Sequence, residues 1–262
     1  MSINLQKGQK IDLSKGGAGG TGLHRVMVGL GWDEAPRSGG GLFGLRQPQP
    51  IDCDASVILC GANGKIVSTD IKQCCVYFGN LRHYSGAIVH QGDNLTGAGD
   101  GDDEQIMVNL PMVPSNIEKM VFVVNIYDAR ARNQHFGMIR NAFIRLVDVD
   151  TGTEICRFNL SENYNGMTGL VVGEIYKRNG DWKFNAIGQP VQEASRLDSL
   201  IRLYLRNKKL LGGKYYGNQS AKGTESFSRQ FHEAGPCWTW LGYESLRRWF
   251  RFRPGCLRFP AG

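Results

Sequence analysis

The sequence predicts an all-β fold, a sandwich or a barrel, for most of its 262 residues. From residue 3 to about residue 190, short runs rich in Val, Ile, Leu, Phe and Tyr alternate with clusters of Gly, Asn and Asp, the pattern of short strands joined by turns. Glycine contributes 35 residues, well above its usual share of roughly 7%. The length allows one large domain, or one domain with an appendage.

Nine runs have the length and composition of strands, and one later segment has the period of a helix. The Asn63-Gly64 and Asn179-Gly180 pairs predict tight hairpin turns, since Asn and Gly tolerate the positive φ angles that such turns need. Residues 194–207 predict a helix because Leu197, Leu200 and Ile201 recur at helical spacing. The predicted strands are 26–30, 55–60, 76–78, 106–110, 121–127, 142–149, 154–160, 169–176 and 181–186.

Two segments interrupt the strand pattern. Residues 34–50 are rich in Gly, Pro and Ser and predict a long loop. Residues 206–262 change character, because aromatic residues there alternate with arginines without a regular period. We therefore place a domain boundary near residue 205, between a β-domain of residues 1–205 and a basic aromatic extension of residues 206–262.

The positive charge of the chain belongs to this extension. The formal net charge is +7, but residues 206–262 hold 11 Lys and Arg against 3 Asp and Glu, which leaves 20 basic and 21 acidic groups for residues 1–205. The β-domain therefore gives no electrostatic reason to expect a nucleic-acid partner. The extension offers a separate hypothesis, in which its arginines and aromatic rings contact an anionic membrane surface or single-stranded nucleic acid.

The sequence predicts a cytoplasmic protein. No apolar run approaches the roughly 20 residues of a membrane-spanning helix, and the first residues lack the apolar stretch of a secretory signal. The cysteines are odd in number and contain no CxxC pair, so we expect reduced thiols rather than a disulfide framework or a structural zinc site. The histidines are scattered and match no catalytic motif, so we expect no enzyme activity.

The segment from residue 93 to residue 104 concentrates negative charge. Like charges at contact distance repel by roughly 1 kcal/mol even in water, so a bound cation would relieve the repulsion. Calcium is the best match, since it takes six to eight oxygen ligands in flexible geometry, whereas magnesium needs a stricter octahedron and ranks second. A solvated acidic turn is the alternative. The carboxylates of the segment are Asp93, Asp100, Asp102, Asp103 and Glu104.

A second acidic pair precedes a predicted strand. Asp52 and Asp54 are two residues apart, so in an extended chain their side chains would face the same side and could share one ion. Asp33 and Asn80 come from other predicted strand ends, and they could approach the same end of a sandwich.

Several motifs occur together in a recognisable order. They include GLGWD at 29–33, IDCDAS at 51–56, DNLTGAGDGDDEQI at 93–106, VFVVNIYDARARNQHFG at 121–137 and GDWKFNAIG at 180–188. In this combination residues 1 to about 190 resemble the TerD domain of tellurium-resistance and general stress proteins. The resemblance implies a two-sheet β-sandwich with short helices, to which the extension is added.

The resemblance also implies a ligand set for Ca²⁺. The aspartate pair and the acidic loop supply the oxygens, including backbone carbonyls at glycines. The family often shows a DxDxDxS pattern, whereas this chain has Pro50 before Asp52, Asp54 and Ser56. One acidic ligand is therefore missing, which leaves open whether one ion or two are bound. The implied metal-binding residues are Asp52, Asp54, Asp93, Asn94, Gly97, Gly99, Asp102, Asp103 and Glu104.

The function that the resemblance implies is a binding role in bacterial stress response. Members belong to tellurite-resistance and stress operons and have no established catalytic activity. We therefore expect a calcium-binding scaffold or sensor, with other tellurite-resistance or stress proteins as partners at the inner membrane surface. The alternative is a protein that associates with membranes or nucleic acid through residues 206–262.

Overall fold

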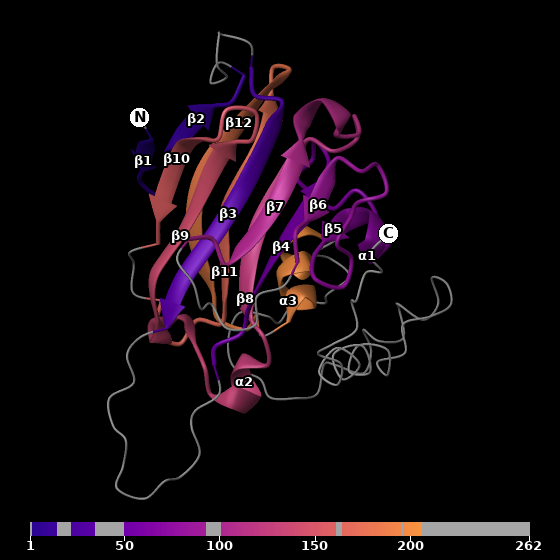
Figure 1. The fold of residues 1–262 in the computed structure, drawn as a ribbon. Coiled ribbons are helices and arrows are strands. Elements are labelled where there is room, and N and C mark those ends of the chain that lie inside the picture. The colour runs from indigo at the N-terminus through magenta and orange to yellow at the C-terminus, as the bar shows by residue number, and fades with distance from the viewer. Residues whose placement is uncertain are drawn as a thin grey trace, which may run out of the picture. The chain divides into compact units, whose positions relative to one another are not determined.

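The protein folds as two six-stranded β-sheets packed face to face (Figure 1). The computed structural model describes residues 2–14, 22–34, 50–92, 101–160, 164–194 and 196–205. All of them belong to one unit of the chain, residues 1–208. The predicted two-sheet sandwich with short helices is confirmed.

The first sheet, sheet A, places β3 next to β7 and β9, so that residues near position 30 lie beside residues near position 104. Its pairings are antiparallel except that of β1 with β10, which is parallel. In spatial order its strands are β1 (Ile3–Leu5), β10 (Thr153–Asn159), β9 (Ile139–Asp148), β3 (Arg25–Glu34), β7 (Glu104–Asn109) and β6 (Ile88–His90).

The second sheet, sheet B, is antiparallel throughout. Every residue of β4 is buried, and β5 pairs with only two of them, Val57 and Ile58. Among the described residues, the edge of β4 at Ala55 therefore has no neighbouring strand on the β5 side. In spatial order the strands are β2 (Lys10–Asp12), β12 (Asp181–Val191), β11 (Gly169–Arg178), β8 (Lys119–Ile126), β4 (Cys53–Cys60) and β5 (Cys75–Val76).

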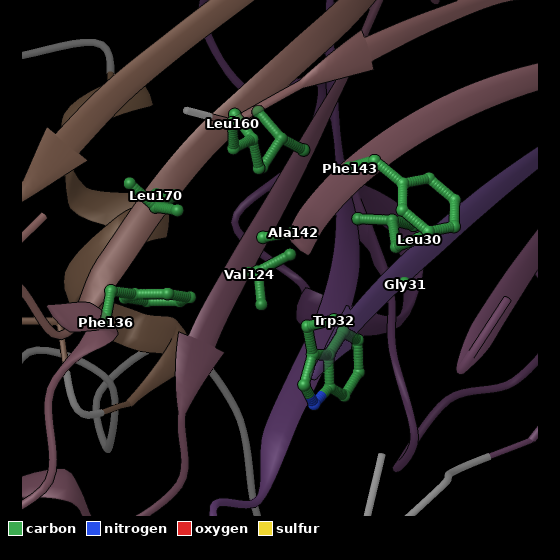
Figure 2. Close-up of a pocket in the computed structure, with 10 residues that line it drawn as sticks. Leu30, Gly31, Trp32, Val124, Phe136, Ala142, Phe143, Leu160 and Leu170 are labelled. Atoms are coloured by element: carbon green, nitrogen blue, oxygen red, sulfur yellow. The ribbon is translucent and has the colours of Figure 1, made fainter. Parts of the chain in front are cut away.

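A continuous apolar core fills the space between the sheets. Alternate residues of β4, β8 and β12 point into it, among them Val57, Phe122 and Phe184, all fully buried. At one end of the core a small recess is lined almost entirely by carbon, including Trp32, Phe136 and Phe143 (Figure 2). The recess is a packing gap, since its lining offers hardly any polar surface to a ligand.

Short helices and turns complete the sandwich. The three α-helices of the described residues are α1 (Ile71–Cys74), α2 (Ala129–Arg132) and α3 (Leu197–Ile201), and 3₁₀ turns span Leu110–Met112, Phe136–Met138 and Arg202–Tyr204. None of these helices is long and apolar enough to cross a membrane.

The predicted helix at residues 194–207 is shorter than expected. The Ala194 amide donates to Thr168 Oγ1, and a Cβ on Gly169 would lie 2.4 Å from the Ala194 side chain, so Ala194 is fixed against β11 before the helix begins. The helix then covers the apolar outer face of sheet B with Leu200. The helical spacing of the leucines therefore reflects this contact with sheet B, but it predicted a helix that is too long.

All nine predicted strands exist, most with longer bounds. The Asn179-Gly180 hairpin is confirmed: both residues have positive φ, and Arg178 pairs with Asp181. At Asn63-Gly64 the chain also turns, but only an isolated bridge between Cys60 and Ile66 follows. The expected loop at residues 34–50 begins later, because Glu34 still belongs to β3; residues 35–49 lie outside the described residues.

Candidate metal centre

The predicted aspartate pair lies at the start of β4 and is buried. Asp52 and Asp54 are only 4% and 3% exposed. Cys53 and Ala55 point into the core between the sheets, so Asp54 faces the opposite side, the outer face of sheet B. Both carboxylates are therefore largely removed from water. A negative charge that is buried in this way needs a compensating partner.

Glu104 reaches β4 from the other sheet. Its Oε2 accepts a hydrogen bond from the Ala55 amide, while His90 Nε2 lies 3.3 Å from the Ala55 carbonyl oxygen and 3.6 Å from Glu104 Oε2. His90 Nδ1 accepts from the Gly92 amide, which leaves the ring proton on Nε2 as a donor. These side chains replace the strand that is missing beside Ala55, and we call Glu104, His90 and Ala55 the interior clamp.

Asp103 is fixed by two backbone contacts with β3. Its amide donates to the Leu30 carbonyl at 2.8 Å, and its Oδ2 accepts from the Trp32 amide at 2.7 Å. Burial raises the pKa of Asp103, the hydrogen bond from Trp32 opposes this, and the nearby charges of Asp33 and Asp102 raise it further. Asp33 therefore lies close to the acidic segment, as expected.

The Cys53 thiol is influenced by both acidic segments. Its pKa is raised well above the usual value, first by burial and then by Asp54, Glu104, Asp52 and Asp103 in that order. Glu104 and Asp103 are far from Cys53 in sequence, so their influence reflects the fold. The structure thus gathers four of the predicted metal-binding residues around the start of β4.

Two neutral oxygen donors in the same place were not predicted. Asn125 of β8 pairs with Asp54 in register, and its Nδ2 donates to Asp54 Oδ2 at 3.4 Å. Asn125 Oδ1 and Ser56 Oγ are buried, and neither has a hydrogen-bond partner in the described part of the chain. Carboxylate, amide and hydroxyl oxygens are the ligands that hard cations prefer. The sequence could have indicated Ser56, because it matches the serine of the DxDxDxS pattern. No motif in the sequence indicated Asn125.

One cationic side chain approaches the aspartate pair. Arg132, at the end of α2, has its Nη1 3.7 Å from Asp52 Oδ2 and its guanidinium 5.0 Å above the Tyr127 ring. The residues that flank α2, Asp128 and Asn133, both adopt left-handed conformations, which fold the chain tightly enough to turn Arg132 back toward β4.

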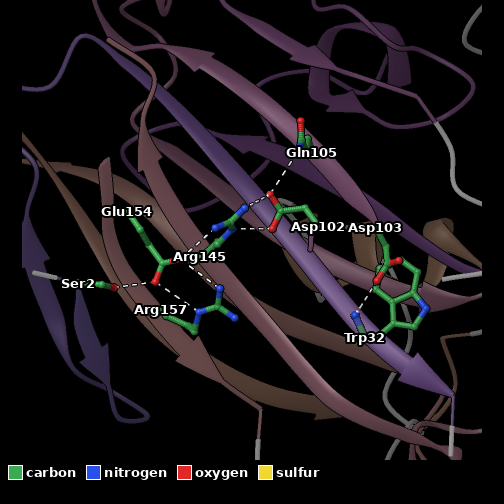
Figure 3. Close-up of polar contacts among 8 residues, drawn as sticks. All are labelled: Ser2, Trp32, Asp102, Asp103, Gln105, Arg145, Glu154 and Arg157. Carbon is green, nitrogen blue, oxygen red and sulfur yellow. Dashed lines mark hydrogen bonds and ion pairs between the residues drawn. The ribbon is translucent and has the colours of Figure 1, made fainter. Parts of the chain in front are cut away.

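Asp102 points away from this group. Its two oxygens accept hydrogen bonds from Arg145 of β9 on the outer face of sheet A, at 2.7 and 2.9 Å (Figure 3). The structure therefore does not direct Asp102 to the same place as Glu104. The Asn80 side chain does not contact this group either. It donates hydrogen bonds to the backbone carbonyls of Lys72 and Cys75.

Other predicted residues fall outside the described ranges. Asp93, Asn94, Gly97 and Gly99 belong to this set, as does the whole extension of residues 206–262. Within the described residues, no group of three or more His, Cys, Asp or Glu side chains is arranged to hold a metal ion. The described donors are thus of the right chemical kind for a cation but form only part of the predicted ligand set.

These observations define the class of protein: a two-sheet β-sandwich with buried carboxylates near the start of β4. The sequence of residues 1–204 matches the TerD domain family, and the chain belongs to this family.

Curated relatives share most of the described domain. The chain is 52% identical over 209 residues to stress response protein SCP2 of Bacillus subtilis (strain 168), covering 78% of this chain and all of the relative. It is 43% identical over 189 residues to the tellurium resistance protein TerD of Serratia marcescens, covering 72% and 91% respectively. A crystal structure of a protein of unknown function, SAV2460, is similar in fold, with a TM-score of 0.50, 21% identity, and coverage of 67% of this chain and 96% of that one.

Proposed function

We propose that the protein is a calcium-binding member of the tellurium-resistance and general stress family, and that it acts as a binding module rather than an enzyme. The observation that carries the proposal is that the Glu104 carboxylate, next to Asp103 in the chain, bonds the Ala55 amide beside the buried Asp52 and Asp54. The names of its relatives, which refer to stress response and tellurium resistance, support the biological context.

Charge balance favours a bound cation at this place. Burial of a carboxylate is costly unless a partner compensates its charge. Arg132 lies near Asp52, and the ring of His90 lies beside Glu104. A divalent ion held by the four carboxylates would add positive charge to this largely buried group.

The donor set favours calcium over magnesium. Asp54, Asp103 and Glu104 would supply charged oxygens, and Ser56 and Asn125 would supply neutral ones from the same sheet. Such a mixed set suits the flexible coordination of calcium better than the strict octahedron of magnesium. By resemblance, Asp52, Asp93, Asn94, Gly97 and Gly99 would complete the site for one or two ions.

The chemistry of the cysteines is in keeping with a non-catalytic role. The buried cysteines of the described residues are free thiols, and burial raises the pKa of Cys53 and Cys75 well above the usual value. Thiols with raised pKa are poor nucleophiles. We infer a scaffold or sensor that changes its stability with calcium and works in the cytoplasm with other stress proteins, at the inner face of the membrane.

A thermal unfolding experiment tests the proposal. Calcium at a hundredfold excess over its dissociation constant should stabilise the full-length protein by about 2.7 kcal/mol. Replacing Asp54 and Asp103 together by asparagine should remove most of this gain. The matched control is Asp198→Asn. It removes an exposed carboxylate of α3 that pairs with Arg202.

Three results would contradict the proposal. A melting temperature that is the same in calcium and in chelator would remove the metal site, and equal protection by magnesium would assign the site to a different ion. If the control variant loses the calcium effect as fully as the double variant, the site is not where we place it.

A further inference from the structure

A charged network crosses the outer face of sheet A and ends on Asp102 (Figure 3). Arg145 Nε donates to Asp102 Oδ1 at 2.7 Å, and its Nη2 donates to Oδ2 at 2.9 Å, which makes a bidentate pair. The Asp102 side chain is 0% exposed, whereas that of Arg145 is 26% exposed. Gln105 Nε2 adds a third donor at 3.3 Å.

Arg145 is itself held from the other side. Its Nη1 donates to Glu154 Oε2 at 3.1 Å, and Arg157 donates to the same oxygen at the same distance. Ser2 Oγ bonds the other oxygen of Glu154 at 2.7 Å, and the Arg157 guanidinium lies 4.0 Å from the centre of the Phe143 ring. We call Asp102, Arg145, Glu154 and Arg157 the outer strap.

Glycines in β3 allow the strap to pass. A Cβ on Gly29 would lie 2.3 Å from Asp102 Oδ1, so any other residue there would displace the carboxylate from Arg145. A Cβ on Gly31 would lie 2.4 Å from Phe143 and 2.6 Å from the carbonyl oxygen of Gly101. The glycines of the GLGWD motif thus leave room on the outer face of β3, and residues 101 and 102 pack there against the sheet.

The strap explains how neighbouring residues face opposite sides. In an extended strand, residues two apart face the same side, yet Asp102 lies on the outer face while Glu104 lies in the interior. The chain bends at Asp103, just before β7 begins, and the Asp103 amide bonds the Leu30 carbonyl at this bend. Fixing Asp102 outward therefore determines where Asp103 and Glu104 point.

We propose that Arg145 is a positioning residue for the cation site: through Asp102 it holds the bend at Asp103 that directs Glu104 inward, and Asp102 itself is not a ligand. This inference rests on the proposed calcium binding. Groups that orient metal ligands without touching the ion typically change metal affinity ten- to hundredfold when they are removed.

The direction of the effect separates positioning from simple electrostatics. Arg145 is a cation, so its removal would by charge alone strengthen binding of another cation. Its removal would also free Asp102, which would strengthen binding if Asp102 were a ligand. A positioning role predicts the opposite, weaker calcium binding after Arg145→Gln.

Calorimetric calcium titrations of the full-length protein test this prediction. Arg145→Gln and Asp102→Asn should each weaken binding by about tenfold or more, and the double variant should be no weaker than either single one. Gly29→Ala should act in the same direction. The matched control is Arg25→Gln, which removes a cation from the same face of β3 that pairs with surface Asp150, and it should leave the affinity unchanged.

Amide hydrogen exchange in chelator gives a second reading without metal. In Arg145→Gln the Asp103 amide should exchange faster, while the amides of β11 should not, which separates loss of the bend from general destabilisation. Unchanged or tighter calcium binding by Arg145→Gln, with normal binding by the unaltered protein, would overturn the positioning role alone. Absence of calcium binding by the unaltered protein would overturn the proposed function, and the metal role of Arg145 with it.

Discussion

The outer strap and the interior clamp use carboxylates only two residues apart in entirely different ways. Asp102 lies where arginines can reach it, and each of its oxygens accepts a hydrogen bond from the Arg145 guanidinium. Glu104 lies inside the sandwich, where its contacts include a backbone amide and a histidine ring. The bend at Asp103 therefore decides the role of each carboxylate, since it determines which residue faces the solvent side.

The two regions also differ in what they hold together. The strap ties the outer face of one sheet, from Ser2 across β10 and β9 to the start of β7. The clamp joins the two sheets, because Glu104 and His90 belong to sheet A and Ala55 belongs to sheet B. Loss of the clamp should therefore cost more than loss of the strap.

The largest effect is expected from Glu104→Ala. Without calcium, the variant leaves the buried Ala55 amide and the His90 ring without the carboxylate beside them, and each buried donor left without an acceptor costs about 1–3 kcal/mol. Urea unfolding in chelator measures the loss. Glu104→Gln, which keeps an acceptor oxygen, should lose less. A loss from Glu104→Ala no greater than that from Asp198→Ala on the surface of α3 would mean that the clamp does not join the sheets.

Arg145→Gln should have an intermediate effect on the protein without metal. The fully buried Asp102 carboxylate loses its bidentate partner, but Arg145 is partly exposed, so we expect a loss of about 1.5 kcal/mol. The same urea experiment applies, with Arg25→Gln as the matched variant, for which little change is expected. If the two arginine variants unfold at the same urea concentration, the strap is no stronger than an ordinary surface pair.

Sequence periodicity predicted the strands but not the details that separate strap from clamp. Each of the nine runs of β-type residues overlaps a strand, because buried strands are rich in apolar residues, although the run at 76–78 shares only Val76 with β5. Short edge strands such as β1, β2 and β6 were missed, since three residues are too few to show a period.

The sequence predicted the candidate site only in part, because contacts between strands leave no local pattern in the sequence. The sequence identifies which segments carry carboxylates, and in the structure Glu104 of the second segment bonds the Ala55 amide beside Asp54 of the first. Periodicity cannot show that the chain bends at Asp103, nor that Asn125 of a distant strand pairs with Asp54. Both depend on contacts between strands, which composition and spacing do not record.

The smallest expected effect is a pH dependence that belongs to the strap alone. Burial raises the pKa of Glu154, but hydrogen bonds from Arg157, Ser2 and Arg145 outweigh it and lower the pKa from 4.5 to about 2. A carboxylate whose pKa is lower in the folded state stabilises the protein above pH 4.5, and this contribution is lost as the pH falls toward 2. Because Glu154 is partly exposed, solvent screening limits the contribution to about 1 kcal/mol.

Unfolding in chelator at pH 5.5 and at pH 3 should therefore show a larger drop in stability for the unaltered protein than for Glu154→Gln, which cannot titrate. The difference between the two drops isolates Glu154 from the other carboxylates, since these titrate in both proteins. Asp181→Asn, at the exposed β11–β12 turn, is the matched variant and should keep the full drop. Identical drops in the unaltered protein and Glu154→Gln would show that the arginines of the strap do not hold Glu154 in its charged form, and that the outer face owes its order to packing rather than to charge.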